Sequence, residues 1–112
     1  MSKMNSKTYS QHSKSAITLL GNLIRAARKE QKLTTTEVAE RAGISRNFLQ
    51  RIEKGDPKSN IGAFFEVATI VGVKLFDADE ASLSKHIRQV EDKLTLLPKS
   101  IRKKQRKVDD DF

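Results

Sequence analysis

Four polar side chains in one short stretch, "SRNFLQRIEKG", carry groups that match the edges of nucleic-acid bases. They are Arg46, Asn47, Gln50 and Arg51. A guanidinium can pair with O6 and N7 of guanine, and an Asn or Gln amide with N6 and N7 of adenine, each worth about 1–3 kcal/mol of discrimination. Between them stand apolar residues. Leu49 and Ile52 would anchor a short helix, whereas Phe48 could partly face outward and contact a thymine methyl group.

A second set of residues could hold phosphate groups. Thr34, Thr35 and Thr36 stand at the start of a predicted helix, where free backbone N–H groups and the helix dipole favour an anion. Further candidates flank the loop that follows the next helix, namely Lys54, Lys58 and Asn60. Such contacts would position a nucleic acid without reading its sequence.

Two short helices joined by a tight turn would present these residues. Thr34 and Glu37 have the spacing of a capping box, which predicts a helix over residues 35–42. Its inward residues would be Val38 and Ala39. Gly43 suits the left-handed position after its end. Ile44 would fill the space between this helix and the next.

The next helix is expected over residues 46–54, with Ser45 as its N-cap and Gly55 at its end. The Asp56-Pro57 step prevents its continuation. Two helices joined in this way form a helix-turn-helix, which holds the first half of its second helix outward for a DNA major groove.

Flanking helices complete the domain. One is expected to run to Gln31, with Ser13 or Ser15 as its cap and apolar positions that step by three and four. These positions are Ile17, Leu20, Leu23, Ile24 and Ala27. Another is expected over residues 61–71, with Asn60 as its cap. Its inward residues would be Phe64, Val67, Ala68 and Val71. Residues 72–77, "GVKLFD", could form a short β segment or the entry to the next helix.

Residues 79–97 are expected to form a fifth helix, which Pro98 ends. Its apolar residues step four, three, four, three, a narrow heptad stripe. They are Leu83, Ile87, Val90, Leu94 and Leu97. The stripe could form a dimer or partner surface through Leu83, Ile87, Val90 and Leu94, or it could pack on its own domain.

Composition narrows the function classes. The net charge is +8, with basic residues concentrated in the first half and near both ends, which favours a polyanion partner. There is no cysteine, so disulfides and thiolate chemistry are excluded, and cytoplasmic localisation is expected. No apolar run approaches the roughly 20 residues of a membrane span, and the start lacks a secretory signal. No metal-spaced cluster, phosphate loop or catalytic constellation is present, so we expect neither cofactor nor enzyme activity.

The stretch "LTTTEVAERAGISRNFLQRIEKG" resembles the XRE-type helix-turn-helix family, the fold of phage repressors and many bacterial regulators. The resemblance covers about Leu20 to Leu75 and departs from the family pattern mainly at Thr35, where Gln is common. It implies an all-α fold of five helices: a phage-repressor-like domain, a C-terminal helical extension and a basic then acidic tail.

Roles for individual residues follow from this resemblance. It implies that Arg46, Asn47 and Gln50 read bases and that Arg51 contacts a base or a phosphate. It also implies that Arg28 and Glu53 form a structural ion pair rather than DNA contacts.

A wider pattern is similar to HipB-type antitoxin regulators. It comprises "LLGNLIRAARKEQKL", "GDPKSNIGAFFEVATIVGVKLF" and "LLPKSIRKKQRKVDDDF". The resemblance implies a homodimer that binds a palindromic operator upstream of its own operon and also binds a HipA-family serine/threonine kinase toxin. The HipB core is shorter, so the segment after residue 78 leaves the mode of kinase binding open. The tail could grip the toxin, or its basic run, residues 99–107, could add a nonspecific DNA arm.

The expected organisation has four parts: a disordered tail over 1–14, the DNA-binding domain over 15–78, the C-terminal helix over 79–97, and a charged flexible tail over 98–112. The expected function is a sequence-specific transcriptional regulator, an autorepressor and antitoxin of a HipA-kinase-type operon. The alternative is an adaptor with a helix-turn-helix fold that binds a partner protein and holds DNA only loosely.

Overall fold

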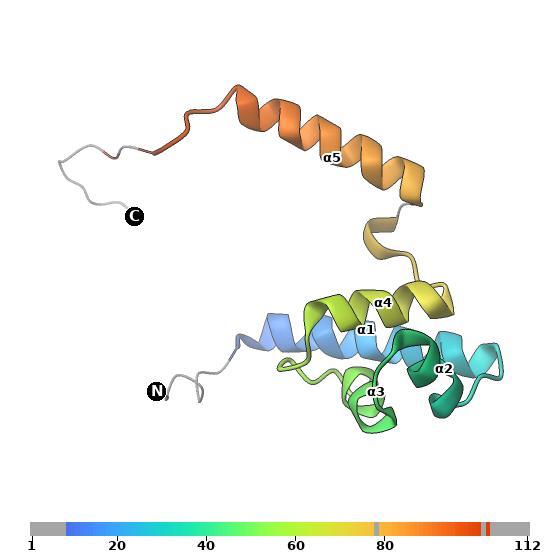
Figure 1. Cartoon of the computed structure of the whole chain (residues 1–112). Coiled ribbons are helices and arrows are strands. Elements are labelled where there is room, and N and C mark those ends of the chain that lie inside the picture. The colour runs from blue at the N-terminus through green and yellow to red at the C-terminus, as the bar shows by residue number, and fades with distance from the viewer. Residues whose placement is uncertain (1–8, 78, 102, 104–112) are drawn as a thin grey trace. The chain divides into compact units, whose positions relative to one another are not determined.

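A computed structural model describes residues 9–77, 79–101 and 103 as an all-helical chain (Figure 1). Its elements are α1 (Gln11–Glu30), α2 (Thr35–Ala42), α3 (Arg46–Glu53), α4 (Ile61–Val71), a 3₁₀ helix η2 (Leu75–Asp77) and α5 (Glu80–Thr95). No strand occurs in these described residues, and the predicted all-α fold with five α-helices is confirmed. None of these helices combines the length and apolar character that crossing a bilayer requires.

The chain divides into two compact units, with the division between Asp77 and Ala78. In the first unit, α1 packs against α3 and α4, and α2 packs against both α3 and α4. Residues 1–8, 102 and 104–112 lie outside the described part, and with them most of the predicted terminal tails.

Helix α1 begins earlier than the sequence indicated. Neither Ser13 nor Ser15 is its cap, because Ser10 takes that place and its Oγ accepts a hydrogen bond from the Ser13 N–H at 3.2 Å. Residues 11–14, expected in a disordered tail, are therefore helical. Almost all side chains of this first turn and a half are polar, so apolar periodicity could not reveal it.

The core of the first unit is small and apolar. Its buried members are Ile24, Val38, Ala39, Leu49, Ile52, Phe64, Val67, Ala68 and Val71. Every inward residue predicted in α2, α3 and α4 is among them. Leu23, also predicted to face inward, is instead 47% exposed. At about 100° per residue, it sits at the edge of the α1 stripe centred on Ile24.

Two glycines bring α1 and the end of α3 into close contact. A Cβ added to Gly21 would lie 2.6 Å from the Ile52 carbonyl oxygen and 2.7 Å from that of Glu53. A Cβ added to Gly55, whose φ is +76°, would lie 2.7 Å from the Thr18 Cα. The backbones touch without intervening side chains, which fixes the distance of α3 from α1.

The segment after α4 is neither of the two expected forms. Gly72 ends α4 in the left-handed region, and residues 75–77 form the 3₁₀ helix η2. Phe76 has a φ of 57°, which is unfavourable for a residue with a side chain, and it is 78% exposed. The end of α4 is tied to α1 because Gln31 Nε2 donates to the Val71 carbonyl at 2.6 Å.

The second unit contains one helix in its described residues. Asp79 caps α5 and accepts a hydrogen bond from the Ser82 N–H at 2.9 Å. The helix ends with Leu96 as its C-cap, slightly before the predicted end at residue 97.

Candidate nucleic-acid interface

Helix α2 starts with the predicted capping box. Thr34 Oγ1 accepts from the Glu37 N–H at 3.0 Å, and the Thr34 N–H donates to Glu37 Oε1 at 2.8 Å. This hydrogen bond from the Thr34 backbone lowers the pKa of the Glu37 carboxyl below its ordinary value. Thr34 is therefore a structural cap: its N–H donates within the box and its hydroxyl oxygen accepts there, while the hydroxyl hydrogen takes no part in the box.

Thr35 and Thr36 remain open to an anion. Their amides precede the first intrahelical hydrogen bond, from the Val38 N–H to the Thr34 carbonyl, so they have no acceptor within the helix. These two backbone N–H groups are therefore available for the phosphate contact predicted at this helix start.

The turn between α2 and α3 has the expected geometry. Gly43 is left-handed, with a φ of 70° and a ψ of 31°, and Ile44 packs against the core. Ser45 caps α3, with its Oγ accepting from the Phe48 N–H at 3.0 Å. These local bonds set the direction in which α3 leaves the turn.

Helix α3 separates its two faces cleanly. Leu49, Ile52 and Glu53 are buried. Arg46, Asn47 and Gln50 are exposed, and no side-chain hydrogen bond or ion pair joins them to another described residue. The three predicted base readers thus project from a helix that the core holds in place.

Arg51 differs from the other three candidates. Its guanidinium lies 5.2 Å from the centroid of the Phe48 ring, and its Nε lies 3.9 Å from Asp56 Oδ2. Both contacts are exposed and weak, roughly 0–1 kcal/mol each. Arg51 thus differs from Arg46, Asn47 and Gln50 in having side-chain contacts with other described residues.

The ion pair expected between Arg28 and Glu53 is present at the base of the interface. Arg28 Nε donates to Glu53 Oε2 at 2.6 Å, and Nη2 donates to Oε1 at 3.0 Å, a bidentate pair. A third donor, Nη1, bonds the Leu33 carbonyl at 3.0 Å. Both residues are buried, and the hydrogen bond that Arg28 donates to the Glu53 carboxylate raises the pKa of Arg28 although burial opposes this.

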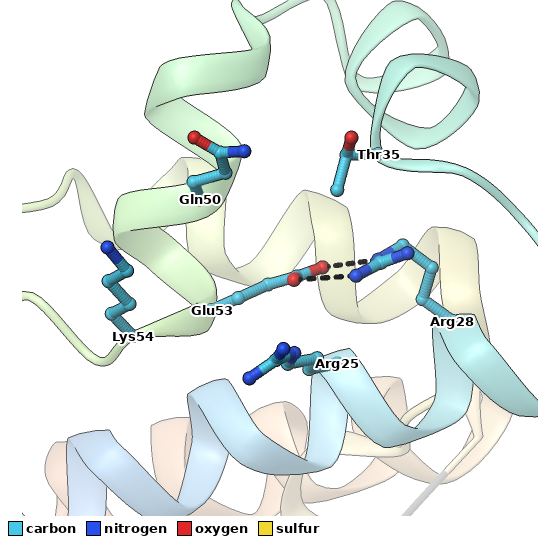
Figure 2. A pocket seen from close by; sticks show the side chains of 6 residues that line it. All are labelled: Arg25, Arg28, Thr35, Gln50, Glu53 and Lys54. Atoms are coloured by element: carbon cyan, nitrogen blue, oxygen red, sulfur yellow. Dashed lines mark hydrogen bonds and ion pairs between the residues drawn. The ribbon is translucent and has the colours of Figure 1, made fainter.

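This pair forms part of the lining of an open cavity of about 270 Å³. Figure 2 shows the side chains that line it: Arg25 and Arg28 on α1, Thr35 on α2, Gln50 and Glu53 on α3, and Lys54, the C-cap residue of α3. Arg28 and Glu53 neutralise each other. Arg25 and Lys54 have no ion-pair partner among the described residues, so the cavity carries an excess of positive charge.

Arg25 is a candidate that sequence reasoning missed. It stands one turn before Arg28 on α1, outside the two helices of the turn motif, and only the packing of α1 against α3 brings it to Gln50 and Lys54. The signal available was its spacing of three residues from Arg28, which places both on one face of a helix.

The remaining phosphate candidates lie in the loop between α3 and α4. The Lys58 N–H donates to Asp56 Oδ1 at 2.9 Å, and its side chain is exposed. Asn60 caps α4 and its Oδ1 accepts from the Ala63 N–H at 3.1 Å, so only its amide nitrogen is left for a ligand. Neither residue lines the cavity beside Arg28 and Glu53.

Comparison with known proteins agrees with this geometry. A family model described as helix-turn-helix matches residues 24–77. The uncharacterized HTH-type transcriptional regulator y4mF of Sinorhizobium fredii is 36% identical over 56 residues, which cover 50% of this chain and 74% of that regulator. The chain belongs to the helix-turn-helix family.

A second relative of this helix-turn-helix protein is the immunity repressor protein of Bacillus phage phi105, also 36% identical over 56 residues. The match covers 50% of this chain but 39% of the phage protein, well under half of its length. No solved structure matches the chain significantly. The family match ends at residue 77, where the first unit ends, so α5 lies outside it.

Proposed function

We propose that this helix-turn-helix protein is a sequence-specific repressor that places α3 in the major groove of operator DNA. Family membership gives the coarser function, a DNA-binding regulator of transcription. The observation that carries the finer proposal is the exposed, unpartnered row of Arg46, Asn47 and Gln50 on a helix fixed by a buried ion pair. Side chains held in this way can form bidentate contacts to guanine and adenine without first breaking internal bonds.

Backbone phosphates would be held around this row. The cavity beside Arg25, Thr35 and Lys54 has the charge to accept a phosphate group, with the Thr35 amide and the start of α2 adding favourable dipoles. Lys58 and Asn60 would hold a phosphate on the other side of α3. These contacts would supply affinity and register, whereas the α3 row would supply sequence preference.

A single domain of this size reads few base pairs, so we propose that the protein acts as a homodimer. Two recognition helices about 34 Å apart would then read a palindromic operator on one face of the duplex. The predicted dimer or partner residues, Leu83, Ile87, Val90 and Leu94, all lie on α5.

We further propose that the protein represses its own operon and is the antitoxin of a HipA-family serine/threonine kinase encoded beside it. The support is the resemblance of three segments to HipB-type regulators, residues 19–33, 55–76 and 96–112, the last largely outside the described residues. Co-expression of the tagged chain with the kinase from the neighbouring gene should give a stable complex and reduced kinase activity. Separate elution with unchanged kinase activity would refute the antitoxin role and leave the repressor role standing.

The test of DNA readout is fluorescence anisotropy with the full chain, on the duplex upstream of its own gene and on a scrambled duplex of equal length. A preference of about 10³-fold for the upstream duplex is expected at physiological salt. The Arg46→Ala/Asn47→Ala variant should lose most of this preference, because each lost base pair contact costs about 1–3 kcal/mol.

A second variant separates base contacts from phosphate contacts. Arg25→Gln should weaken binding to both duplexes alike and reduce the salt slope, log K against log salt, by about 0.9 for the lost phosphate contact. Lys74→Gln removes one exposed charge away from the cavity and is the matched control, expected to change the slope less. Equal affinity of the unaltered chain for both duplexes would reject sequence readout and favour the alternative, an adaptor that binds a protein through its helix-turn-helix.

A further inference from the structure

Helix α5 presents an apolar stripe that its own unit does not cover. Ile87 and Val90 are each 55% exposed and Leu94 is 60% exposed. Leu97, just beyond the helix, is 50% exposed, and no residue of α5 is buried. As the single helix in the described residues of the second unit, α5 has no neighbour within that unit to pack against.

A helix of this kind needs a partner for its stability. Even Ala-rich helices shorter than about 12–15 residues are marginal in water, and α5 is only slightly longer, with 16 residues. It is not Ala-rich and includes the β-branched Ile87 and Val90 on its apolar side, which lower its helix propensity. Most of its stabilisation must therefore come from burying the stripe.

We propose that α5 pairs with α5 of a second copy of this chain as a parallel, two-stranded coiled coil. The proposal rests on the homodimer of the proposed function and assigns that dimer its surface and its orientation. The spacing of the stripe is the first argument for a second copy. Leu83, Val90 and Leu97 fall at heptad position d, and Ile87 and Leu94 at position a. An a/d seam this narrow fits one partner helix, whereas packing on a globular domain uses a wider stripe.

The residues away from the seam support the same arrangement. The outer positions of the heptads carry Lys85, Arg88, Gln89 and Asp92, all exposed. A polar outer face on a helix with one apolar seam is typical of a two-stranded coil rather than a helix enclosed by several partners.

Charges beside the seam favour the parallel orientation. In a parallel coil, His86 at position g faces Glu91 at position e of the second copy, and symmetry gives two such contacts between an imidazole and a carboxylate. An antiparallel coil that sets Ile87 against Val90 would instead bring His86 to Lys93 of the second copy and Glu91 to Ser84. Only the parallel arrangement pairs complementary groups.

The seam is short, so the pairing should be weak on its own. Four apolar seam residues on each helix, with Leu97 just beyond its end, bury less than the 1,200–2,000 Å² or so of a standard stable interface. Binding of both copies to one duplex would strengthen it, because the second contact becomes intramolecular. The dimer should therefore dissociate in the micromolar range without DNA and tighten on a palindromic duplex.

The absence of cysteine from the chain allows a direct test. In a parallel coil, residue 90 of one copy lies opposite residue 90 of the other. The full-length Val90→Cys variant should therefore form a disulfide dimer under mild oxidation without DNA. Pairing raises the effective thiol concentration to the millimolar range, so cross-linking at micromolar protein should be on the order of 100-fold faster than for unpaired chains.

Gln89→Cys is the matched control, because it adds a thiol one residue away on the outer face and should cross-link only at the slow rate. Circular dichroism establishes that both variants retain their helix content. Selective cross-linking of Val90→Cys supports the proposal.

Two results would overturn it. If Val90→Cys does not cross-link alone but does so when mixed with Ile87→Cys, the helices are antiparallel. If neither sample cross-links faster than Gln89→Cys, α5 does not pair with a second copy. These cross-linking measurements need no DNA, so they are independent of the operator test. Operator preference without cross-linking would refute this inference alone. Cross-linking without operator preference would refute the proposed function alone.

Discussion

At the scale of single residues, Arg28 connects three parts of the first unit. It stands on α1, forms a bidentate pair with Glu53 at the end of α3, and donates to the Leu33 carbonyl in the loop before α2. One guanidinium thus fixes the position of both helices of the turn motif relative to α1. The exposed Arg25, one turn earlier, has no ion-pair partner in the described residues and is available to a ligand.

Replacing Arg28 should therefore cost far more stability than replacing Arg25. Arg28→Ala leaves the buried Glu53 carboxylate unpaired and is expected to lower the free energy of unfolding by about 3–5 kcal/mol. Arg25→Ala removes an exposed side chain and should change it by at most about 0.5 kcal/mol. Urea denaturation followed by circular dichroism measures both. Similar midpoints for the two variants would show that the ion pair does not hold the fold.

At the scale of elements, the close approach of α1 and α3 fixes the position of the helix that carries the proposed base readers. Gly21→Ala would place a Cβ 2.6 Å from the Ile52 carbonyl, so the helices must move apart. Overpacking of this kind costs typically about 1–3 kcal/mol. Asn22→Ala, at the next, exposed position of α1, is the control and should be neutral or slightly stabilising. Thermal unfolding compares them, and equal melting temperatures would contradict the backbone contact.

The same elements show what the sequence could and could not predict. Capping chemistry is local, so Thr34, Ser45 and Asn60 were identified as helix starts, and the stripes of α2, α3 and α4 predicted the core. The start of α1 could not be predicted correctly because its first turn is almost wholly polar and several serines could serve as its cap.

Features that depend on packing between elements were harder to predict. The contact between Gly21 and α3 joins residues more than thirty positions apart, and no local pattern marks it. The place of Arg25 in the cavity lining could not be predicted for the same reason, because only tertiary structure brings α1 beside α3. The Arg28–Glu53 pair joins residues 25 positions apart, and the sequence led to its expectation only through the resemblance to a family that has it.

At the scale of the whole molecule, the two units have different roles in the proposed function: the first binds DNA and the second forms the dimer. The first unit holds the row of proposed base readers and the cation-lined cavity, and it ends at residue 77, as the family match does. The second unit holds the seam of α5. Dimerisation is then separable from readout. Val90→Asp, which sets two carboxylates against each other in the seam, should weaken the dimer without changing the contacts of either α3.

A homodimer that reads one face of DNA must be sensitive to the spacing of its half-sites. Recognition helices on one face are separated by about 10–10.5 base pairs, so inserting 5 base pairs between the half-sites turns one of them to the opposite face. The full chain should lose at least about tenfold in affinity. Once one copy is bound, the other copy can no longer reach its half-site, so its binding no longer benefits from being intramolecular. A 10-base-pair insertion returns the half-sites to one face and should restore part of the loss. Anisotropy titrations on the three duplexes at one salt concentration measure this series. Equal affinity for all three would mean that each copy reads its half-site alone, even if Val90→Cys had cross-linked.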